Sequence, residues 1–375
     1  MKRHTEPGPS DDWRPTCSLA VLKIRAAMLK AIRSVFLQNG YLEVETPLLS
    51  SDIVVDAHLH PFPVDIPRGR YYLQTSPEAG MKRLLAAGAG SIFQITRSFR
   101  GEEQGRRHNP EFTIIEWYGV ESDERDQMAL TEHLVREAVL AAQETASSDM
   151  DSAHSVLRLP TTAFRSTTYD QAFERFIGMR VLELNADQLR QLAQSAGVQL
   201  PDSLLRQGSE SEQRSEPEQR SGTDSESGFS LQDHAACVDA ILNVLLAECV
   251  EPHLGVEVPE FLTHYPASQA ALAEICDHDP RTSRRFELYM NGLELCNGYF
   301  ELTDPVELAR RDAVQNDRRS SEKVGSLPGA PHLLHAMQHG LPRCAGVALG
   351  FDRLVMAALQ TNSIDQVIPF PFARA

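Results

Sequence analysis

The sequence predicts an α+β fold in which helices flank a sheet of antiparallel strands. Residues 91–102 and 111–120 are rich in β-branched and aromatic residues and are separated by a polar stretch, which is the pattern of two strands joined by a long loop. Asn291 and Gly292 stand between two apolar runs and form a preferred dipeptide for a tight two-residue β-turn. Apolar residues recur at helical spacing in residues 19–38, which predicts one of the flanking helices.

Length, composition and charge narrow the class of protein. The chain has 375 residues, of which 42% are hydrophobic, enough for a sizeable core and for two or three domains. No apolar run approaches the ~20 residues that span a bilayer, and the first residues lack the apolar segment of a signal peptide, so we expect a cytoplasmic protein without membrane association.

The formal net charge of −16 disfavours nonspecific binding to nucleic acid, which depends on Lys and Arg. The six cysteines are scattered without a C-x-x-C pair, so neither a zinc site nor a disulfide framework is indicated.

Two segments are predicted to be disordered. The first is the N-terminal segment, residues 1–17. The second, residues 206–228, contains no large apolar residue and is dominated by Ser, Glu, Gln, Arg and Gly, so it cannot contribute to a packed core. We interpret it as an insertion within one domain that spans residues 18–375; a regulatory or partner-binding tail is the alternative.

A short strand leads into a helix near residue 78. Residues 71–75 predict the strand, and Ser76, Pro77 and Glu78 form a turn that begins the helix. Proline in the first turn and an acidic residue beside it both favour a helix N-terminus. Glu78 is therefore either a partner of the helix dipole or a ligand for a positively charged group.

The strands at 91–102 and 111–120 collect charged and aromatic side chains. Side chains alternate between the two faces of a strand. The residues that share a face are Ser98, Arg100 and Glu102 on the first strand, and Phe112, Ile114, Glu116 and Tyr118 on the second. The loop adds Arg106, Arg107 and His108, whose donors suit phosphate oxygens, and Asn109 and Phe112 follow where an aromatic ring can carry a flat base. A solvated charged face is the alternative.

The Asn-Gly turn fixes the pairing of the strands at 286–290 and 293–296. It predicts that Met290 pairs with Leu293 and Tyr289 with Glu294, and that one face carries Glu287, Tyr289, Glu294 and Cys296. Two carboxylates become diagonal neighbours on this face, and a bound cation such as Mg²⁺ relieves their repulsion. Two exposed acids on a hairpin are the alternative. Asn297 and Gly298 interrupt the alternation, which we expect to turn Glu301 in a different direction.

Three motifs resemble one family. Residues 93–118, with the strings RSFRGE, RHNPEFT and EWY, resemble motif 2 of the class II aminoacyl-tRNA synthetases and are closest to the lysyl-tRNA synthetase subgroup. Residues 40–47 (GYLEVETP) resemble motif 1, and residues 346–353 (GVALGFDR) resemble motif 3. The resemblance implies a class II synthetase-like antiparallel sheet and a homodimer formed through motif 1. An amphipathic helix packed within one subunit is the alternative to that dimer.

The resemblance also implies a role for individual residues. Catalytic roles fall to Arg100, Glu102 and Arg353. The implied ATP contacts are Arg100, Glu102, His108, Asn109, Phe112, Glu294, Leu295, Gly350 and Arg353. The implied amino-acid pocket consists of Ser76, Pro77, Glu78, Glu116, Tyr118, Asn297, Tyr299, Glu301 and Ala348. Glu287 and Glu294 are the implied magnesium ligands.

Departures from the lysyl-tRNA synthetases point to a different acceptor. Those enzymes usually have glycine where Ala348 stands and serine where Phe300 stands, and motif 1 begins too early here to leave room for their N-terminal anticodon-binding OB fold. A stand-alone core with the strings GVALGFDRL and HYPASQA resembles the elongation factor P β-lysine ligases, a family of paralogues. The resemblance implies that the chain uses ATP and Mg²⁺ to activate (R)-β-lysine, or lysine, as an adenylate. The aminoacyl group is then transferred from the adenylate to the ε-amine of a lysine of elongation factor P.

Two alternatives remain. A truncated lysyl-tRNA synthetase would acylate tRNA, against which the acidic net charge argues. A non-catalytic paralogue would have lost motif residues, whereas Arg100, Glu102, Glu287, Glu294 and Arg353 are all in place.

Overall fold

The centre of the molecule is an eight-stranded sheet with the order β1-β5-β6-β11-β10-β9-β8-β7. A computed structural model describes residues 13–57, 59–148, 155–205 and 231–375. The strands are β1 (Leu42–Glu43), β5 (Ile92–Phe99), β6 (Glu111–Val120), β7 (Arg165–Thr168), β8 (Glu260–Thr263), β9 (Arg285–Met290), β10 (Leu293–Phe300) and β11 (Cys344–Gly350). The outermost pairs β1–β5 and β7–β8 are parallel, and the other neighbours are antiparallel. The predicted α+β class is confirmed, with a parallel pair at each edge.

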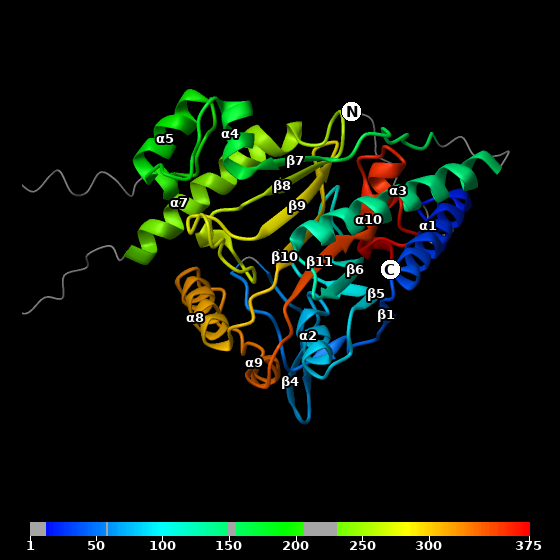
Figure 1. The fold of residues 1–375 in the computed structure, drawn as a ribbon, viewed down its shortest axis with the longest axis horizontal. Helices are drawn as coiled ribbons and strands as arrows, with labels where there is room; N and C mark the ends of the chain where they lie inside the picture. Colours follow the sequence, from blue (N-terminus) through cyan, green and yellow to red (C-terminus); the bar gives the residue numbers. More distant parts are fainter. Residues whose placement is uncertain (1–12, 58, 149–154, 206–230) are drawn as a thin grey trace, which may run out of the picture.

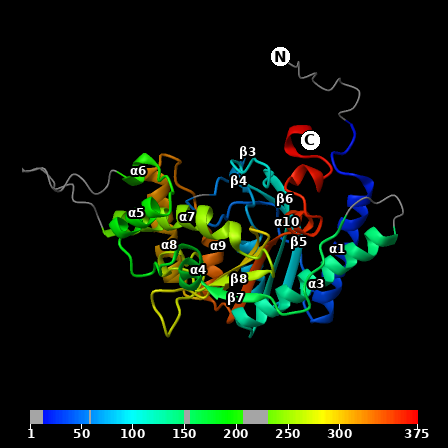
Figure 2. The ribbon, with the colours of Figure 1, turned by 90° about the horizontal axis from the view of Figure 1, so that it is seen from above.

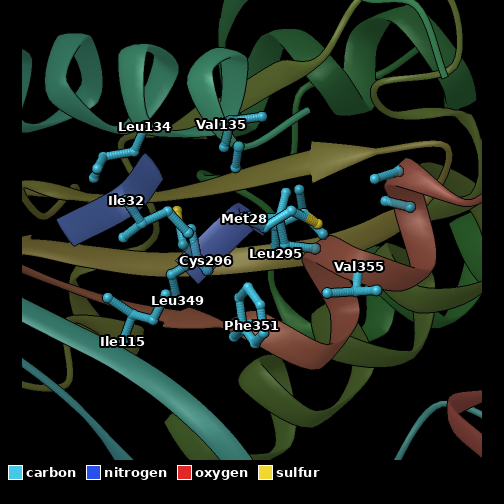
Figure 3. Packing of buried hydrophobic residues seen from close by; sticks show 14 of the residues in the cluster. Met28, Ile32, Ile115, Leu134, Val135, Leu295, Cys296, Leu349, Phe351 and Val355 are labelled. Atoms are coloured by element: carbon cyan, nitrogen blue, oxygen red, sulfur yellow. The ribbon is translucent and has the colours of Figure 1, made fainter. Parts of the chain in front are cut away.

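The main core lies between one face of this sheet and three helices, α1 (Leu19–Gln38), α3 (Glu124–Ser148) and α10 (Phe351–Ala358) (Figure 1). Met28 of α1 and Val135 of α3 pack into it together with Leu349 of β11 (Figure 3). Trp117 of β6 is fully buried in the same core. Since side chains alternate along a strand, the neighbours of these core residues point to the other face.

The opposite face carries α2 (Glu78–Ala86) and α9 (Pro331–Gln338), which pack against the sheet and against each other. Helix α8 (Pro305–Ser321) contacts α9. A separate three-stranded sheet has the order β2-β4-β3. Its strands are β2 (Leu49–Ser50), β3 (Pro63–Ile66) and β4 (Gly69–Leu73). These elements enclose the sheet face on which the predicted pocket residues lie.

A second core lies at the β7–β8 end, around α4 (Tyr169–Ile177), α5 (Ala186–Ser195) and α7 (Leu231–Leu245). The short helix α6 (Asp202–Leu205) contacts α7. Figure 2 shows this group at one end of the molecule, with α1 and α3 at the other. A π-helical turn and a 3₁₀ turn follow α7, and they carry the chain back to the sheet at Glu251–His253.

The hairpin of β9 and β10 confirms one prediction and corrects another. Asn291 and Gly292 adopt positive φ angles of 53° and 66°, and the turn pairs Met290 with Leu293 and Tyr289 with Glu294 as predicted. A β-bulge then shifts the register between Glu294 and Cys296, so that Leu288 faces Cys296 and Glu287 faces Asn297.

The bulge changes which side chains share the pocket face. The prediction that Cys296 lies beside Glu287 is wrong, because the extra residue turns Cys296 into the main core. The predicted interruption at Asn297 and Gly298 is also misplaced. Those two residues continue the regular pairing of β10, so Asn297 and Glu301 keep the alternation of one strand.

The two segments predicted to be disordered fall largely outside the described residues, which exclude 1–12 and 206–230. The described end of the first one is attached to the body of the protein. The Thr16 backbone N–H donates to the Pro369 carbonyl at 2.8 Å, and Cys17 is buried in the main core. The attached chain therefore begins before residue 18. Within the described residues, no helix is long and apolar enough to cross a membrane.

Candidate active site

Four adjacent strands present one row of side chains on the face opposite the main core. Glu116 of β6 is paired with Ala348 of β11, Ala348 with Asn297 of β10, and Asn297 with Glu287 of β9. A second row joins Tyr118, Gly346, Tyr299 and Arg285. The register of the sheet therefore brings together pocket residues that lie more than 200 positions apart in sequence.

The first half of the pocket is an ion-paired group that we name the Lys82 centre: Lys82, Glu78 and Glu301. The Lys82 Nζ lies 2.5 Å from Glu78 Oε1 and 2.6 Å from Glu301 Oε2. Lys82 is 2% exposed and Glu301 1%. Burial raises the pKa of Glu301 to about 7, against the opposing pull of the Lys82 charge. Glu78 therefore has a positively charged partner, Lys82, that was not among the predicted site residues.

The second half is a hydrogen-bonded group that we name the Glu116 centre: Glu116, Ser76 and Tyr118. Ser76 Oγ donates to Glu116 Oε2, and Tyr118 OH donates to Glu116 Oε1, both at 2.7 Å. Burial, with a further contribution from the Glu78 charge, raises the pKa of Glu116 to about 8. The Ser76 Oγ also accepts from the Glu78 backbone N–H at 3.1 Å, so the turn that begins α2 joins the two centres.

Small residues of β11 make room for these groups. A Cβ at Gly346 would lie 2.3 Å from Glu301 Oε1 and 2.4 Å from the Tyr118 ring, distances that no real Cβ contact shows. Ala348, paired with both Glu116 and Asn297, puts its methyl group at the centre of the row. A side chain at Gly346 would therefore displace Glu301 or Tyr118.

Two arginines and a histidine form a second group: Arg100 and His108 lie on the loop between β5 and β6, and Arg353 lies on α10. The Arg100 guanidinium lies 5.0 Å above the Phe112 ring, its Nη1 pairs with Glu103 at 3.2 Å, and its buried Nε has no hydrogen-bond partner. Arg353 donates to His108 and, at 3.1 Å, to Glu294 Oε2. Burial and the Arg353 charge lower the pKa of His108, so His108 accepts as a neutral ring.

The helix that carries Arg353 is anchored from two sides. Asp352 accepts the Thr113 backbone N–H at 2.7 Å and pairs with Arg25 of α1 at 2.7 Å. All three groups are buried. The Asp352 carboxylate thereby joins helix α1, strand β6 and helix α10.

The structure does not bring every predicted ATP residue to this point. The Glu102 side chain is 75% exposed, and its nearest charged partner is His60 at 3.5 Å. Asn109 is engaged by main-chain groups, donating to the Glu111 carbonyl at 2.6 Å and accepting from the Phe372 N–H at 2.9 Å. The Leu295 side chain lies in the main core, so only its backbone faces the site. Gly350 immediately precedes α10.

Arg106, Arg107, His108 and Asn362 line an open hollow of about 340 Å³. Their donors suit phosphate oxygens. The hollow lies on the loop, next to the Arg353 contact of His108, and can receive the outer phosphates of a nucleotide.

The predicted magnesium ligands are close together but differ in environment. Glu287 accepts from Tyr265 OH at 2.6 Å and Tyr289 OH at 2.7 Å, and pairs with Arg285 at 2.5 Å. Burial and the Glu287 charge raise the pKa of Glu294. Among the described residues, no group of three or more His, Cys, Asp or Glu side chains is arranged to hold a metal ion.

The pair nevertheless fits Mg²⁺, which is often bound by one or two carboxylates and completed by phosphates and water. A third acid, absent from the predicted site residues, is Glu251, whose Oε1 lies 3.2 Å from Tyr289 OH. Burial and the charges of Glu287 and Glu294 raise its pKa to about 7. Glu251 directly follows the π-helical turn, a feature with no clear signal in sequence.

Residues 12–374 match the family model described as tRNA synthetases class II (D, K and N). The chain belongs to this family. It is also 40% identical over 369 residues to the elongation factor P--(R)-beta-lysine ligase of Pseudoalteromonas translucida, covering 97% of this chain and 98% of that protein. The protein of the same name from Vibrio cholerae is 38% identical, with 98% and 99% covered, and the one from Yersinia enterocolitica is 40% identical, with 97% and 98% covered.

Membership of the class II synthetase family confirms the resemblance drawn from the three motifs. The relatives span the same length as this chain. Lys82 and Glu251 are among the residues beside the predicted site that motif comparison left out. The spacing of Glu78 and Lys82, four residues apart on a predicted helix, was the available signal for the first of them.

Proposed function

We propose that the protein is an ATP-dependent ligase that activates (R)-β-lysine, or lysine, as an aminoacyl-adenylate and transfers it to the ε-amine of a lysine of elongation factor P. The observation that carries the proposal is the two buried acidic centres, one of which lies on the β5–β6 strand pair whose loop carries Arg100. An amino acid with two ammonium groups and one carboxylate matches both centres and that arginine. The name of the full-length relatives supports the same acceptor.

In the first step, one oxygen of the substrate carboxylate attacks the α-phosphate of ATP, and pyrophosphate leaves. Arg100 would neutralise the carboxylate and the α-phosphate, which lets two anions approach each other. His108 and Arg353, already in contact, would hold the outer phosphates. The pocket contributes by fixing the substrate amines, and thereby the direction of the carboxylate.

Glu294 and Glu287 would hold Mg²⁺, which would supply positive charge to the phosphates. The Tyr265, Tyr289 and Arg285 contacts orient Glu287 for that role. Arg353, which pairs with Glu294, positions the second carboxylate.

In the second step, the ε-amine of the acceptor lysine attacks the adenylate carbonyl. A carbon–nitrogen bond forms, the carbon–oxygen bond to phosphate breaks, AMP leaves with the electron pair, and the attacking amine releases one proton to solvent. No covalent bond to the enzyme is required.

Ala348 is the residue that we propose distinguishes β-lysine from α-lysine. Its methyl group lies between Glu116 and Asn297, where it restricts the position of a substrate amine. A β-amine is attached one carbon further from the carboxylate, so the two isomers present their amines at different depths.

A homodimer through motif 1 is a further part of the proposal. Leu37 of α1 and Leu42 of β1 are 61% and 55% exposed. Burial of such side chains against a second copy would be favourable. Light scattering of the purified protein measures the mass directly.

The test is a competition between acceptors. The protein is incubated with ATP, Mg²⁺ and labelled (R)-β-lysine or lysine, with elongation factor P and bulk tRNA together. Label in elongation factor P, with (R)-β-lysine preferred, supports the proposal. Label in tRNA, or no adenylate at all, contradicts it.

A further inference from the structure

Lys82 is a charged side chain in the middle of the pocket that the proposed reaction does not use. We propose that Lys82 is a specificity-determining residue. Its permanent positive charge reduces the Glu78–Glu301 pair to one net negative charge, so that the Lys82 centre and the Glu116 centre each bind one ammonium group of the substrate. The inference rests on the proposed function and deepens it, because it names what makes the pocket select diamino acids.

The position of the Lys82 ammonium is fixed by its surroundings. It contacts Glu78 at 2.5 Å and Glu301 at 2.6 Å, lies 5.9 Å from the Tyr118 ring centroid, and is 2% exposed. Glu78 and Lys82 are on the same helix, four residues apart. Burial opposes the charge, but the carboxylates of Glu301 and Glu78 outweigh it and raise the pKa of Lys82. The ammonium is therefore charged throughout the physiological range.

The charges of the pocket divide into two groups. The Lys82 centre contains two carboxylates and one ammonium, for a net charge of −1. The Glu116 centre contains one carboxylate held by two neutral hydroxyl donors, so it also carries −1 when ionised. A substrate with two ammonium groups can neutralise each centre once, whereas a substrate with one leaves a buried charge without a partner, which costs several kcal/mol.

Lys82 contacts one oxygen of each acid and so holds both carboxylates in place. It contacts Glu78 through Oε1 and Glu301 through Oε2, while Glu301 Oε1 faces Gly346 closely enough that a Cβ there would clash at 2.3 Å. The carboxylates are thus held from two sides in one orientation. Without the ammonium, two buried acids would face each other and would bind a proton, a metal ion or a second amine in its place.

A purely structural Lys82 is the competing explanation, since a buried ion pair also fixes the local fold. The two explanations differ in what a change at Lys82 affects. A purely structural ion pair changes the unfolding midpoint without changing lysine binding by the folded protein, whereas a charge-setting role also changes the affinity for lysine.

The test uses Lys82→Ala with n-propylammonium, and n-propanol as an uncharged compound of similar shape. We expect Lys82→Ala to raise the KM for lysine, measured by ATP–pyrophosphate exchange, at least ~10-fold with a smaller change in kcat. Millimolar n-propylammonium should lower that KM and raise the thermal unfolding midpoint, and n-propanol should do neither. An unchanged KM, or equal rescue by n-propanol, would overturn the inference.

Two further variants keep the test decisive if Lys82→Ala does not fold. Lys82→Met preserves shape without charge, and lysine binding measured by calorimetry should weaken at least ~10-fold; binding within about twofold of the original protein contradicts the inference. Lys82→Met/Glu78→Gln removes both partners and restores a net charge of −1, so it should bind lysine more tightly than Lys82→Met. Weaker binding by the double variant also contradicts it.

Failure of the proposed function is recognised separately. The proposed function requires that the unmodified protein activates lysine or (R)-β-lysine, as measured by ATP–pyrophosphate exchange. If it activates neither, lysine binding measured by calorimetry on Lys82→Met and on the unmodified protein still decides the role of Lys82.

Discussion

The amino-acid pocket and the neighbouring ATP side differ in how far their side chains are already arranged. In the pocket, Glu116 and Lys82 are each 2% exposed and fully engaged by neighbours. On the ATP side, Arg100 is paired with Glu103, the side chains being 26% and 30% exposed, and the Glu102 side chain is 75% exposed.

The difference follows from which elements carry the residues. Strands β6, β10 and β11 and one turn of α2 fix the pocket by register, whereas the ATP side depends on the loop between β5 and β6. Under the proposed function, the substrate amines would meet a prearranged pocket, while ATP would replace an existing ion pair of Arg100. Preorganised sites bind with less ordering of their own side chains.

The largest effect is expected from Arg100→Ala, which removes the guanidinium beside both the carboxylate and the α-phosphate. Loss of one such charge-stabilising donor typically lowers kcat by about 10²–10³, so adenylate formation should fall to near background. ATP–pyrophosphate exchange measures it. The control is Arg97→Ala, three residues earlier on β5 and exposed. Exchange that survives in Arg100→Ala would refute the role given to Arg100.

Glu116→Gln should give the next largest effect, in the pocket. The pKa of Glu116 is about 8 in the free protein, so the group is mostly protonated below that pH. An ammonium favours the carboxylate, so binding must release this proton, and lysine affinity should rise up to ~10-fold per pH unit towards pH 8 and then level off.

Glu116→Gln should weaken lysine binding about 10- to 100-fold at pH 8 and remove this slope. Calorimetry between pH 6.5 and 8.5 measures both. Glu111→Gln, at the start of the same strand and half exposed, is the control. A slope that persists in Glu116→Gln would assign the proton to another group.

Ala348→Gly should change selectivity by about 10-fold, the scale of one methyl-sized difference in a pocket. Removing the methyl group between Glu116 and Asn297 should improve α-lysine relative to (R)-β-lysine. The ratio of their kcat/KM values is the measurement. The control is Ala345→Gly, three residues earlier on β11 and buried. Because strand alternation places Ala345 on the opposite face from Ala348, that variant should leave the ratio unchanged.

Glu103→Gln should have the smallest effect, and in the opposite direction. It frees Arg100 from a partly exposed ion pair, and exposed pairs are worth about 0–1 kcal/mol. The KM for ATP should therefore fall about two- to threefold, with lysine affinity unchanged. An increase in that KM would mean that Glu103 helps to hold Arg100 in place for ATP.

Much of the fold and part of the site could be predicted from sequence. The alternating strands 91–102 and 111–120 and the Asn291–Gly292 turn gave the sheet and the hairpin pairing, because these patterns have local physical causes. The bulge after Glu294 could not be predicted from such local patterns. Nothing in the string LELCNG marks which residue is left unpaired, and packing of both Leu295 and Cys296 in the main core decides it.

The Lys82 centre shows a second limit. Lys82 follows Met81 in an ordinary amphipathic helix pattern, and its role appears only when β10 brings Glu301 to within 2.6 Å of it. Glu251 could not be predicted from local sequence patterns either, because its distance from Glu287 and Glu294 depends on how the turn after α7 packs. Partners far apart in sequence are set by tertiary structure, which local patterns do not encode.

The central claim is that a pocket with two anionic centres selects an amino acid with two ammonium groups before ATP binds. Calorimetry without ATP, at pH 8, compares (R)-β-lysine with 6-aminohexanoic acid, which has a carboxylate but a single ammonium. The account predicts that (R)-β-lysine binds at least ~10-fold more tightly. Equal affinity for the two compounds would contradict it.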